Sequence, residues 1–374
     1  MGAAPEAAIA VVKLKQAKQY LRDFYVINPA AECYQETDIM FALKYLHELA
    51  QRENKPLVIC LALGSNQGGH ASIAPLAGLL DYYGNISNRV IVMGTGNEGD
   101  KQHHFSRIVR DLNEEVEVRI DVGPGVEGFT MELWTDIPNI FGVSIVSPSG
   151  EEIPQASIRG NSIQRYDLVF ERTHVYIGYK LLVEKTNSEL IFFKLISPTA
   201  GIWRLRIRPI KLADGEFHIW LPVQDFLTGD VIFVQADPYT TLTTPGTTKT
   251  PITTSYYNGK DNSIAISSGR GYTRGNRIKP ELTAPGINVK GGLPNNRFAV
   301  RSGSSIATGI TAGAAALLLQ WNVYQQGRVG VDSTQIKNQL VLGAQQKETG
   351  TYPNREWGYG RLDLYGTFDQ MRHY

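Results

Sequence analysis

Residues 303–319 read Gly303-Ser-Ser-Ile-Ala-Thr-Gly-Ile-Thr-Ala-Gly-Ala-Ala-Ala-Leu-Leu-Leu, a turn of small residues that leads directly into an apolar run. Residues 306–321 are apolar on nearly all sides, which predicts a helix buried in the core of the protein. Ser305, at the start of this helix, is expected near unpaired backbone N–H groups and the positive end of the helix dipole. This setting suits a nucleophilic serine and its acyl intermediate. The ordinary alternative is a serine that caps the helix.

The sequence before and after this helix alternates between buried strands and helices. Short apolar runs, typical of strands buried on both faces, occupy residues 8–12, 57–63, 90–93 and 263–266. Amphipathic or capped helices are expected at residues 37–51, 72–83 and 333–342, the last with Ser333 as its cap. Strands that alternate with helices predict a parallel sheet with right-handed crossovers.

The pattern changes near Val116, where short runs with alternating apolar residues begin and continue to about Val234. Pro and Gly separate these runs, which predicts an all-β sandwich of the jelly-roll kind. A Thr-rich connector at residues 240–254 then returns the chain to helices and strands. We therefore expect one α/β unit at residues 1–116 and 235–374, with a parallel sheet flanked by helices, and an inserted β-sandwich or jelly-roll domain at residues 117–234.

The composition is that of an ordinary globular protein. Hydrophobic residues make up 42% of the 374 residues, and 37 Lys and Arg nearly balance 36 Asp and Glu. This balance gives no electrostatic footprint for nucleic acid or for an anionic membrane. No stretch is apolar for long enough to predict a transmembrane helix, and no signal peptide is visible at the N-terminus. Cys33 and Cys60 are expected to be free thiols.

A second informative segment, Met93-Gly-Thr-Gly-Asn-Glu-Gly99, follows a predicted parallel strand. Functional sites of open α/β sheets lie at the carboxyl ends of the strands. The side-chain amide of Asn97 is therefore a candidate donor to an oxyanion. The alternative is a turn asparagine that tolerates a left-handed backbone.

Together these segments resemble the subtilisin-like serine proteases, the subtilases, over residues 1–110 and about 240–366. The resemblance implies Ser305 as the nucleophile and Asn97 as the oxyanion donor. It also implies that Ala62, Leu63 and Gly64 pair with an extended substrate, and that Gly94, Thr95 and Gly96 form a wall of the pocket for the residue before the scissile bond. Residues 278–286 and 358–363 are similar to the run before the nucleophile and to the closing motif of the family.

The run Leu63-Gly-Ser-Asn-Gln-Gly-Gly-His70 and the β insertion are similar to the subtilisin-like proteases of bacterial spore germination. That resemblance implies a jelly-roll insertion and a spore-associated location. It also implies one of two functions. Either the protein cleaves the zymogen of a cortex-lytic enzyme, or it is a pseudoprotease that binds or signals.

The chain departs from the family pattern at the catalytic base. The family's Asp and His motifs precede a segment similar to residues 2–13, and no Gly-His-Gly-Thr run occurs in this sequence. Its seven histidines, of which His70 is the nearest candidate base, are His47, His70, His103, His104, His174, His218 and His373. Gly309 also stands where the family usually has proline.

Three functions remain open from the sequence. The first is a serine endopeptidase whose N-terminal part is missing or supplied as a separate chain, and the second is an inactive pseudoprotease. The third gives the main function to the β insertion as a binding module, against the alternative that the insertion braces the protease part. The substrate is expected to be a protein or peptide. No cofactor is expected; calcium is common among subtilases, but no ligand series for it occurs.

Overall fold

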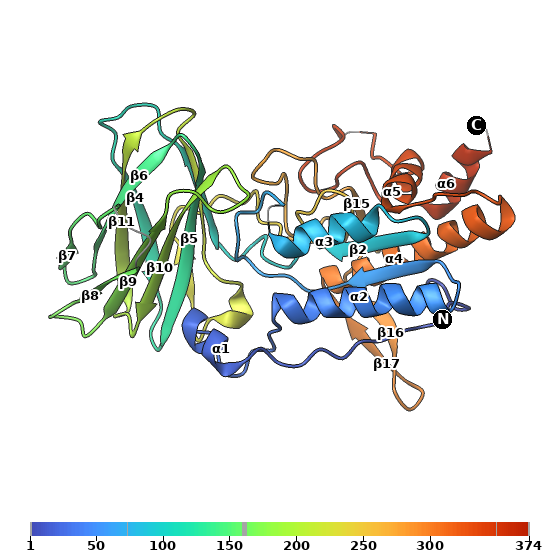
Figure 1. The fold of residues 1–374 in the computed structure, drawn as a ribbon, viewed down its shortest axis with the longest axis horizontal. Helices are drawn as coiled ribbons and strands as arrows, with labels where there is room; N and C mark the ends of the chain where they lie inside the picture. Colours follow the sequence, from blue (N-terminus) through green and yellow to red (C-terminus); the bar gives the residue numbers. More distant parts are fainter. Residues whose placement is uncertain (1, 73, 159–162, 349, 373–374) are drawn as a thin grey trace.

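The computed structural model describes residues 2–72, 74–158, 163–348 and 350–372, and Figure 1 shows an α/β part beside a part made of strands. The α/β part is built on a four-stranded parallel sheet in the order β1-β2-β14-β15. Its strands are β1 (Leu57–Leu61), β2 (Arg89–Gly94), β14 (Ile252–Tyr257) and β15 (Leu282–Pro285). The predicted parallel sheet is confirmed.

Helices cover both faces of this sheet. One face packs against α2 (Glu36–Arg52) and α3 (Pro75–Gly84), and the other against α4 (Ser304–Gln320) and α5 (Ser333–Leu342). Since successive side chains of a strand point to opposite faces, Ile91 of β2 joins the first core and Val90 and Val92 join the second. The short helix α6 (Leu364–Met371) packs against α5.

The helix α4 is apolar on nearly all sides because it contacts all four strands of the sheet. Together with the single turn η2 (Trp321–Gln325), it is long and apolar enough to cross a membrane by length and composition alone. Its packing on the sheet, through Ala315 and Leu318 among others, accounts for that composition.

The second part consists of two antiparallel sheets that pack face to face. The six-stranded sheet has the order β3-β12-β5-β10-β9-β8, and the five-stranded sheet has the order β13-β4-β11-β6-β7. One cluster of buried side chains, which includes Phe129 and Phe193 of the first sheet and Trp203 and Phe141 of the second, fills the space between them. The predicted β-sandwich is confirmed, whereas the jelly-roll connection stays a prediction.

The strands of this sandwich follow the alternation seen in the sequence. They are β3 (His104–Ile108), β4 (Val116–Val122), β5 (Gly128–Asp136), β6 (Ile140–Val146), β7 (Glu152–Ile153), β8 (Ile163–Asp167), β9 (His174–Lys180), β10 (Ser188–Ile196), β11 (Gly201–Lys211), β12 (Glu216–Trp220) and β13 (Val231–Phe233). Strand β3 pairs with β12, so that the sheet takes in residues ahead of the boundary expected at residue 117.

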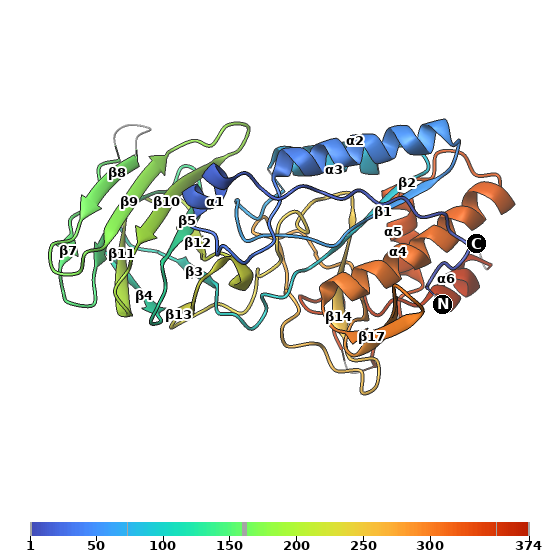
Figure 2. The same ribbon diagram turned by 90° about the horizontal axis from the view of Figure 1, so that it is seen from below.

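Three further elements complete the described chain. Helix α1 (Gln19–Tyr25) lies against the sandwich, where Phe24 stacks on Phe192 of β10. A turn of 3-10 helix, η1 (Gln224–Phe226), follows the last long strand of the sandwich. The hairpin of β16 (Val289–Leu293) and β17 (Arg297–Arg301) projects from the α/β part beside α4 (Figures 1 and 2).

Three local predictions are wrong. Residues 8–12 form no strand but run as an extended segment past α2, with Ile9 and Val11 86% and 82% exposed. Residues 263–266 make only a single bridge, between Ile264 and Tyr257. Both runs have the apolar residues of a strand, but no described strand forms a ladder with either of them.

Cys33 is buried and Cys60 is exposed, and both are free thiols as expected.

The third wrong prediction concerns the residue that caps α5. Asp332 caps this helix by accepting a hydrogen bond from the backbone N–H of Gln335. Ser333 is buried instead, and its hydroxyl accepts from the N–H of Ile91 and donates to the carbonyl of Arg89. An aspartate one residue earlier is an equally good cap, and the serine thereby joins α5 to the sheet.

Candidate active site

Ser305 lies at the N-terminus of α4, where the predicted turn enters the buried helix. The cap position belongs to Gly303, whose φ of 138° is open to glycine alone and which has no side chain to cap the helix. The Ser305 hydroxyl is exposed and donates to the carbonyl of Ala62, at 3.3 Å. Ser305 is therefore not a capping serine, and its hydroxyl faces a segment expected to bind substrate.

The side chain of Asn97 meets the same helix end. Its Oδ1 accepts a hydrogen bond from the backbone N–H of Ser304 at 3.0 Å, which fixes the amide at the start of α4. Among the described residues, neither Asn97 Nδ2 nor the backbone N–H of Ser305 has a hydrogen-bond partner. The Asn97 side chain and the Ser305 N–H thus both lie at the N-terminal end of α4, which is the positive end of the helix dipole.

The two segments expected to bind substrate both approach Thr243, a residue that no sequence motif selects. A Cβ atom placed on Gly64 would lie 2.4 Å from Thr243 Oγ1, and one on Gly96 would lie 2.4 Å from Thr243 Cγ2. Thr243 is buried and donates its backbone N–H to the carbonyl of Thr95. Its side chain therefore lies between the segments 62–64 and 94–96. Gly94 packs directly against α4.

No described histidine forms a hydrogen bond with Ser305. The ring of His70 is buried against Trp220, with 4.0 Å between the centroids, and its nitrogens lie 2.8 and 3.0 Å from the carbonyl oxygens of Leu242 and Asn66. Burial lowers the pKa of His70 to about 4. The remaining described histidines each form a hydrogen bond with a side chain other than Ser305; they are His47, His103, His104, His174 and His218. His373 lies outside the described residues.

The sandwich holds the loop that follows the substrate segment. The backbone N–H of Gly68 donates to the carboxylate of Glu132 at 2.8 Å, and Asn66 Nδ2 donates to the carbonyl of Leu221 at 3.1 Å. Trp134 Nε1 also donates to Glu132. Burial raises the pKa of Glu132, and the hydrogen bonds from Gly68 and Trp134 oppose that shift.

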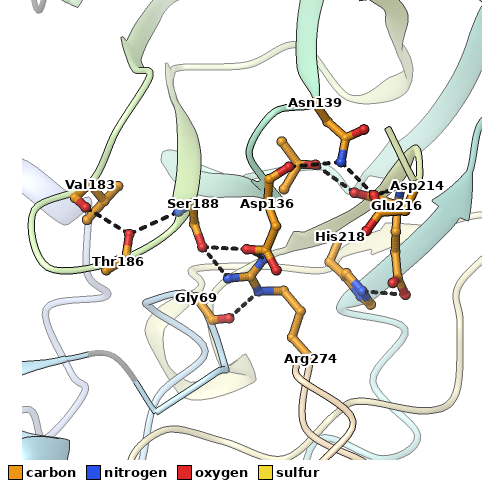
Figure 3. A network of polar contacts seen from close by, with 11 residues as sticks. Gly69, Asp136, Asn139, Val183, Thr186, Ser188, Asp214, Glu216, His218 and Arg274 are labelled. Atoms are coloured by element: carbon orange, nitrogen blue, oxygen red, sulfur yellow. Dashed lines mark hydrogen bonds and ion pairs between the residues drawn. The ribbon is translucent and has the colours of Figure 1, made fainter. Parts of the chain in front are cut away.

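Arg274 crosses the same boundary from the α/β part. Figure 3 shows its guanidinium between the carbonyl of Gly69 and the side chains of Asp136 and Ser188, at 2.6, 2.8 and 2.6 Å. The Arg274 side chain is only 4% exposed. A buried guanidinium with three partners is fixed in one orientation. No sequence signal joins these residues, because Arg274 and Asp136 lie 138 positions apart.

No group of three or more His, Cys, Asp and Glu side chains in the described ranges is placed to hold a metal ion. Gly309, the departure from the family pattern, lies within α4 and does not interrupt it.

An exposed serine hydroxyl at a helix N-terminus, beside an asparagine amide and the carboxyl edge of a parallel sheet, defines the class of α/β serine hydrolases. The sequence model of the subtilase family matches residues 230–360. The structure of the CspB protease of Clostridium perfringens has a TM-score of 0.84 and 27% sequence identity to this chain, covering 91% of this chain and 71% of that protease.

Other solved structures match a smaller part of the chain. The prenylagaramide maturation protease PagA is 25% identical, with a TM-score of 0.30, over 35% of this chain and 45% of its own. No curated protein sequence matches. The family model and the match to the CspB protease support the assignment of this chain to the subtilases, as a serine-type peptidase.

Proposed function

We propose that this chain supplies the nucleophile and the oxyanion hole of a serine endopeptidase. Ser305 attacks the scissile carbonyl, and Asn97 Nδ2 and the Ser305 N–H stabilise the oxyanion that forms. The observation that carries this proposal is the hydrogen bond from the Ser304 N–H to Asn97 Oδ1, which ties the Asn97 side chain to the helix end that bears the exposed Ser305. Neither step uses a metal or a cofactor.

The substrate is proposed to be an extended polypeptide held along residues 62–64 and 94–96. The Ser305 hydroxyl donates to the carbonyl of Ala62, so a chain that reaches Ser305 also reaches this segment. Because Thr243 occupies the space between the two segments, the residue before the scissile bond should have a small side chain. The match to CspB supports the narrower proposal of a spore-associated peptidase that processes a germination zymogen.

The general base is proposed to come from a polypeptide segment outside the described residues, on this chain or on a separate one. No described histidine contacts Ser305, and a serine without a base is a weak nucleophile. Within the described part of the chain, strand β1 pairs only with β2, which leaves its other edge for a further strand. The exposed Ile9 and Val11 provide apolar surface that such a segment would cover.

The lack of a hydrogen bond between Ser305 and any described histidine also favours a second candidate function. This candidate is a pseudoprotease that binds a peptide without cutting it. The substrate segments and oxyanion donors would then serve recognition alone. This reading needs no base, and it keeps the role of residues 62–64 and 94–96.

We also propose that the sandwich is a jelly roll. Eight of its strands follow the orders β3-β12-β5-β10 and β4-β11-β6-β7. When these eight are numbered along the chain, the orders become first-eighth-third-sixth and second-seventh-fourth-fifth, as two interleaved Greek keys require. Strands β8 and β9 extend one sheet, and β13 extends the other.

The decisive experiment labels the natural protein, purified with any polypeptide segments that accompany it, with a fluorophosphonate probe and measures proteolysis in parallel. Ser305→Ala should abolish both labelling and proteolysis. The matched control is Ser87→Ala, which removes an exposed hydroxyl elsewhere in the α/β part and should change neither. Loss of labelling in Ser305→Ala, with labelling retained in the control variant, supports the peptidase.

Two results would count against the peptidase. Proteolysis that survives Ser305→Ala excludes Ser305 as the nucleophile. Absence of labelling and proteolysis in the natural protein, together with retained peptide binding, favours the pseudoprotease. Loss of both signals in Ser87→Ala as well would count against a specific role of the Ser305 hydroxyl.

A further inference from the structure

The β16–β17 hairpin concentrates positive charge close to Ser305. Residues 289–301 contain Lys290, Arg297 and Arg301 and no Asp or Glu. The formal charge of the whole chain is only +1, so the rest of the chain is net acidic. A local cluster of like charges on a nearly neutral protein attracts partners of the opposite sign.

These three cations are unpaired. In the described part of the chain, no carboxylate lies within ion-pair distance of Lys290, Arg297 or Arg301. Arg297 Nε reaches only the carbonyl of Pro294, at 3.5 Å, and Arg301 Nη1 reaches only the carbonyl of Val300, at 3.3 Å. The guanidinium groups therefore keep most of their donors free for a partner.

The two faces of the hairpin differ in chemistry. Its register pairs Lys290 with Val300, which places both on the face that carries Phe298. Phe298 and Val300 are 62% and 53% exposed, and Lys290 Nζ lies 4.7 Å from the centroid of the Phe298 ring. Arg297 and Arg301 alternate with these residues and point to the opposite face. One face thus carries Phe298 and Val300 with a single cation, and the other carries two guanidinium groups beside Val289, Leu293 and Ala299.

Each strand of the hairpin also has an unpaired backbone edge. Among the strands of the described residues, β16 and β17 pair only with each other. An exposed edge is a template for an added strand, whose main-chain hydrogen bonds give affinity while alternate side chains give specificity. A strand added here would place its odd and even side chains beside the Phe298 face and the arginine face respectively.

We propose that this hairpin is a docking site for an extended acidic polypeptide in which acidic and apolar residues alternate. The acidic side chains pair with Arg297 and Arg301, and the apolar ones cover Phe298 and Val300. The base of the hairpin is tied to the active-site turn, because Asn288 N–H donates to Ser302 Oγ at 2.9 Å. A bound polypeptide is therefore held next to Ser305. The proposal requires no bond to be cut and stands apart from the proposed function.

The test measures peptide binding to the 374-residue chain carrying Ser305→Ala, so that cleavage cannot interfere. The probes are three short fluorescent peptides: one alternating Glu and Val, one with the same residues in two blocks, and one alternating Lys and Val. The alternating Glu peptide should bind, and both others should bind roughly tenfold more weakly or not at all. Its affinity should fall when salt rises from about 0.05 M to about 0.5 M.

Charge reversal locates the site. The hairpin variant combines Lys290→Glu, Arg297→Glu and Arg301→Glu. The control variant makes the same change of charge at exposed, unpaired lysines elsewhere and combines Lys185→Glu, Lys211→Glu and Lys260→Glu. The hairpin variant should bind the alternating Glu peptide roughly tenfold more weakly than the control does.

A third variant, Phe298→Ala, keeps the charges of the hairpin and should still weaken binding, because it removes the apolar contact. Circular dichroism should show the same secondary structure for every variant, since the replaced side chains are exposed. Equal affinities of the hairpin and control variants would overturn the proposal, as would absence of binding to the unmodified hairpin. Equal binding of the block and alternating peptides would overturn strand addition as the mode of docking.

Discussion

Glu189 places a carboxyl group inside the sandwich. It lies on β10, on the face shared by Ile191 and Phe193, so that its side chain points into the core between the two sheets. The residue is 0% exposed, and no side chain in the described ranges hydrogen-bonds to its carboxyl oxygens; the backbone of Phe141 acts on the carboxyl in the direction opposite to burial. Burial raises the pKa of Glu189 from 4.5 to about 8. The folded protein therefore keeps this group protonated at neutral pH.

The sign of the effect on stability follows from the two pKa values. Because the pKa of Glu189 is higher in the folded state, its contribution to stability is fully present below about pH 4.5 and is lost as the pH rises through about 8. Within this window the free energy of unfolding falls by about 1.4 kcal/mol per pH unit from this group alone. The loss reaches roughly 3 kcal/mol at pH 7.

Glu189→Gln keeps the shape of the side chain but cannot ionise, and so it should remove this dependence. Urea unfolding between about pH 5 and about pH 8 measures the difference in unfolding free energy between the variant and the wild type. That difference should shift in favour of the variant by roughly 3 kcal/mol across the window. The control is Glu127→Gln, at an exposed glutamate. Parallel pH curves for wild type and Glu189→Gln would refute the assignment of a raised pKa to this carboxyl.

Two further predictions concern glycines and the substrate pocket. Gly309→Ala should stabilise the chain by about 1 kcal/mol in urea unfolding, because the added Cβ meets nothing within 4 Å in the middle of a helix. Gly313→Ala in the same helix should destabilise it, because its Cβ would lie 2.4 Å from that of Ala3, and equal effects of the two variants would contradict the packing described. Thr243→Gly should raise kcat/KM of the active protease for substrates with a large residue before the scissile bond relative to those with a small one, and an unchanged ratio would exclude Thr243 from that pocket.

Periodicity predicted the elements whose burial is one-sided or complete. The alternation at Val116, Val118 and Ile120 corresponds to β4, and every second residue of this strand is buried. The apolar run after Ser305 corresponds to α4 because that helix touches the whole width of the sheet. In both cases the pattern of apolar residues directly reflects what the element packs against.

The same reasoning failed where an apolar run has no neighbour. Residues 8–12 have the composition of a buried strand, yet Ile9 and Val11 are exposed because no described strand pairs with this segment. A strand needs a partner for its backbone N–H and C=O groups, and composition alone cannot supply one. Sequence reasoning therefore recognised the segment but not its environment.

For the candidate site, motifs selected Ser305 and Asn97 but could not select Thr243. A serine or asparagine in a small-residue turn has few roles, so its chemistry can be read locally. Thr243 acquires its place only because Gly64 and Gly96 both approach it in the folded chain. Contacts of this kind depend on tertiary packing between segments far apart in the sequence.

The contacts between the two parts of the molecule favour a bracing role for the sandwich over that of an independent binding module. Glu132 accepts from Gly68, and Arg274 joins Gly69 to Asp136, so buried polar groups of each part are completed by the other. Removal of the sandwich would take these partners away from residues 68 and 69, in the loop that follows the segment containing Ala62, the residue that Ser305 contacts. The geometry of the candidate active site therefore depends on strands that contribute no catalytic group to it.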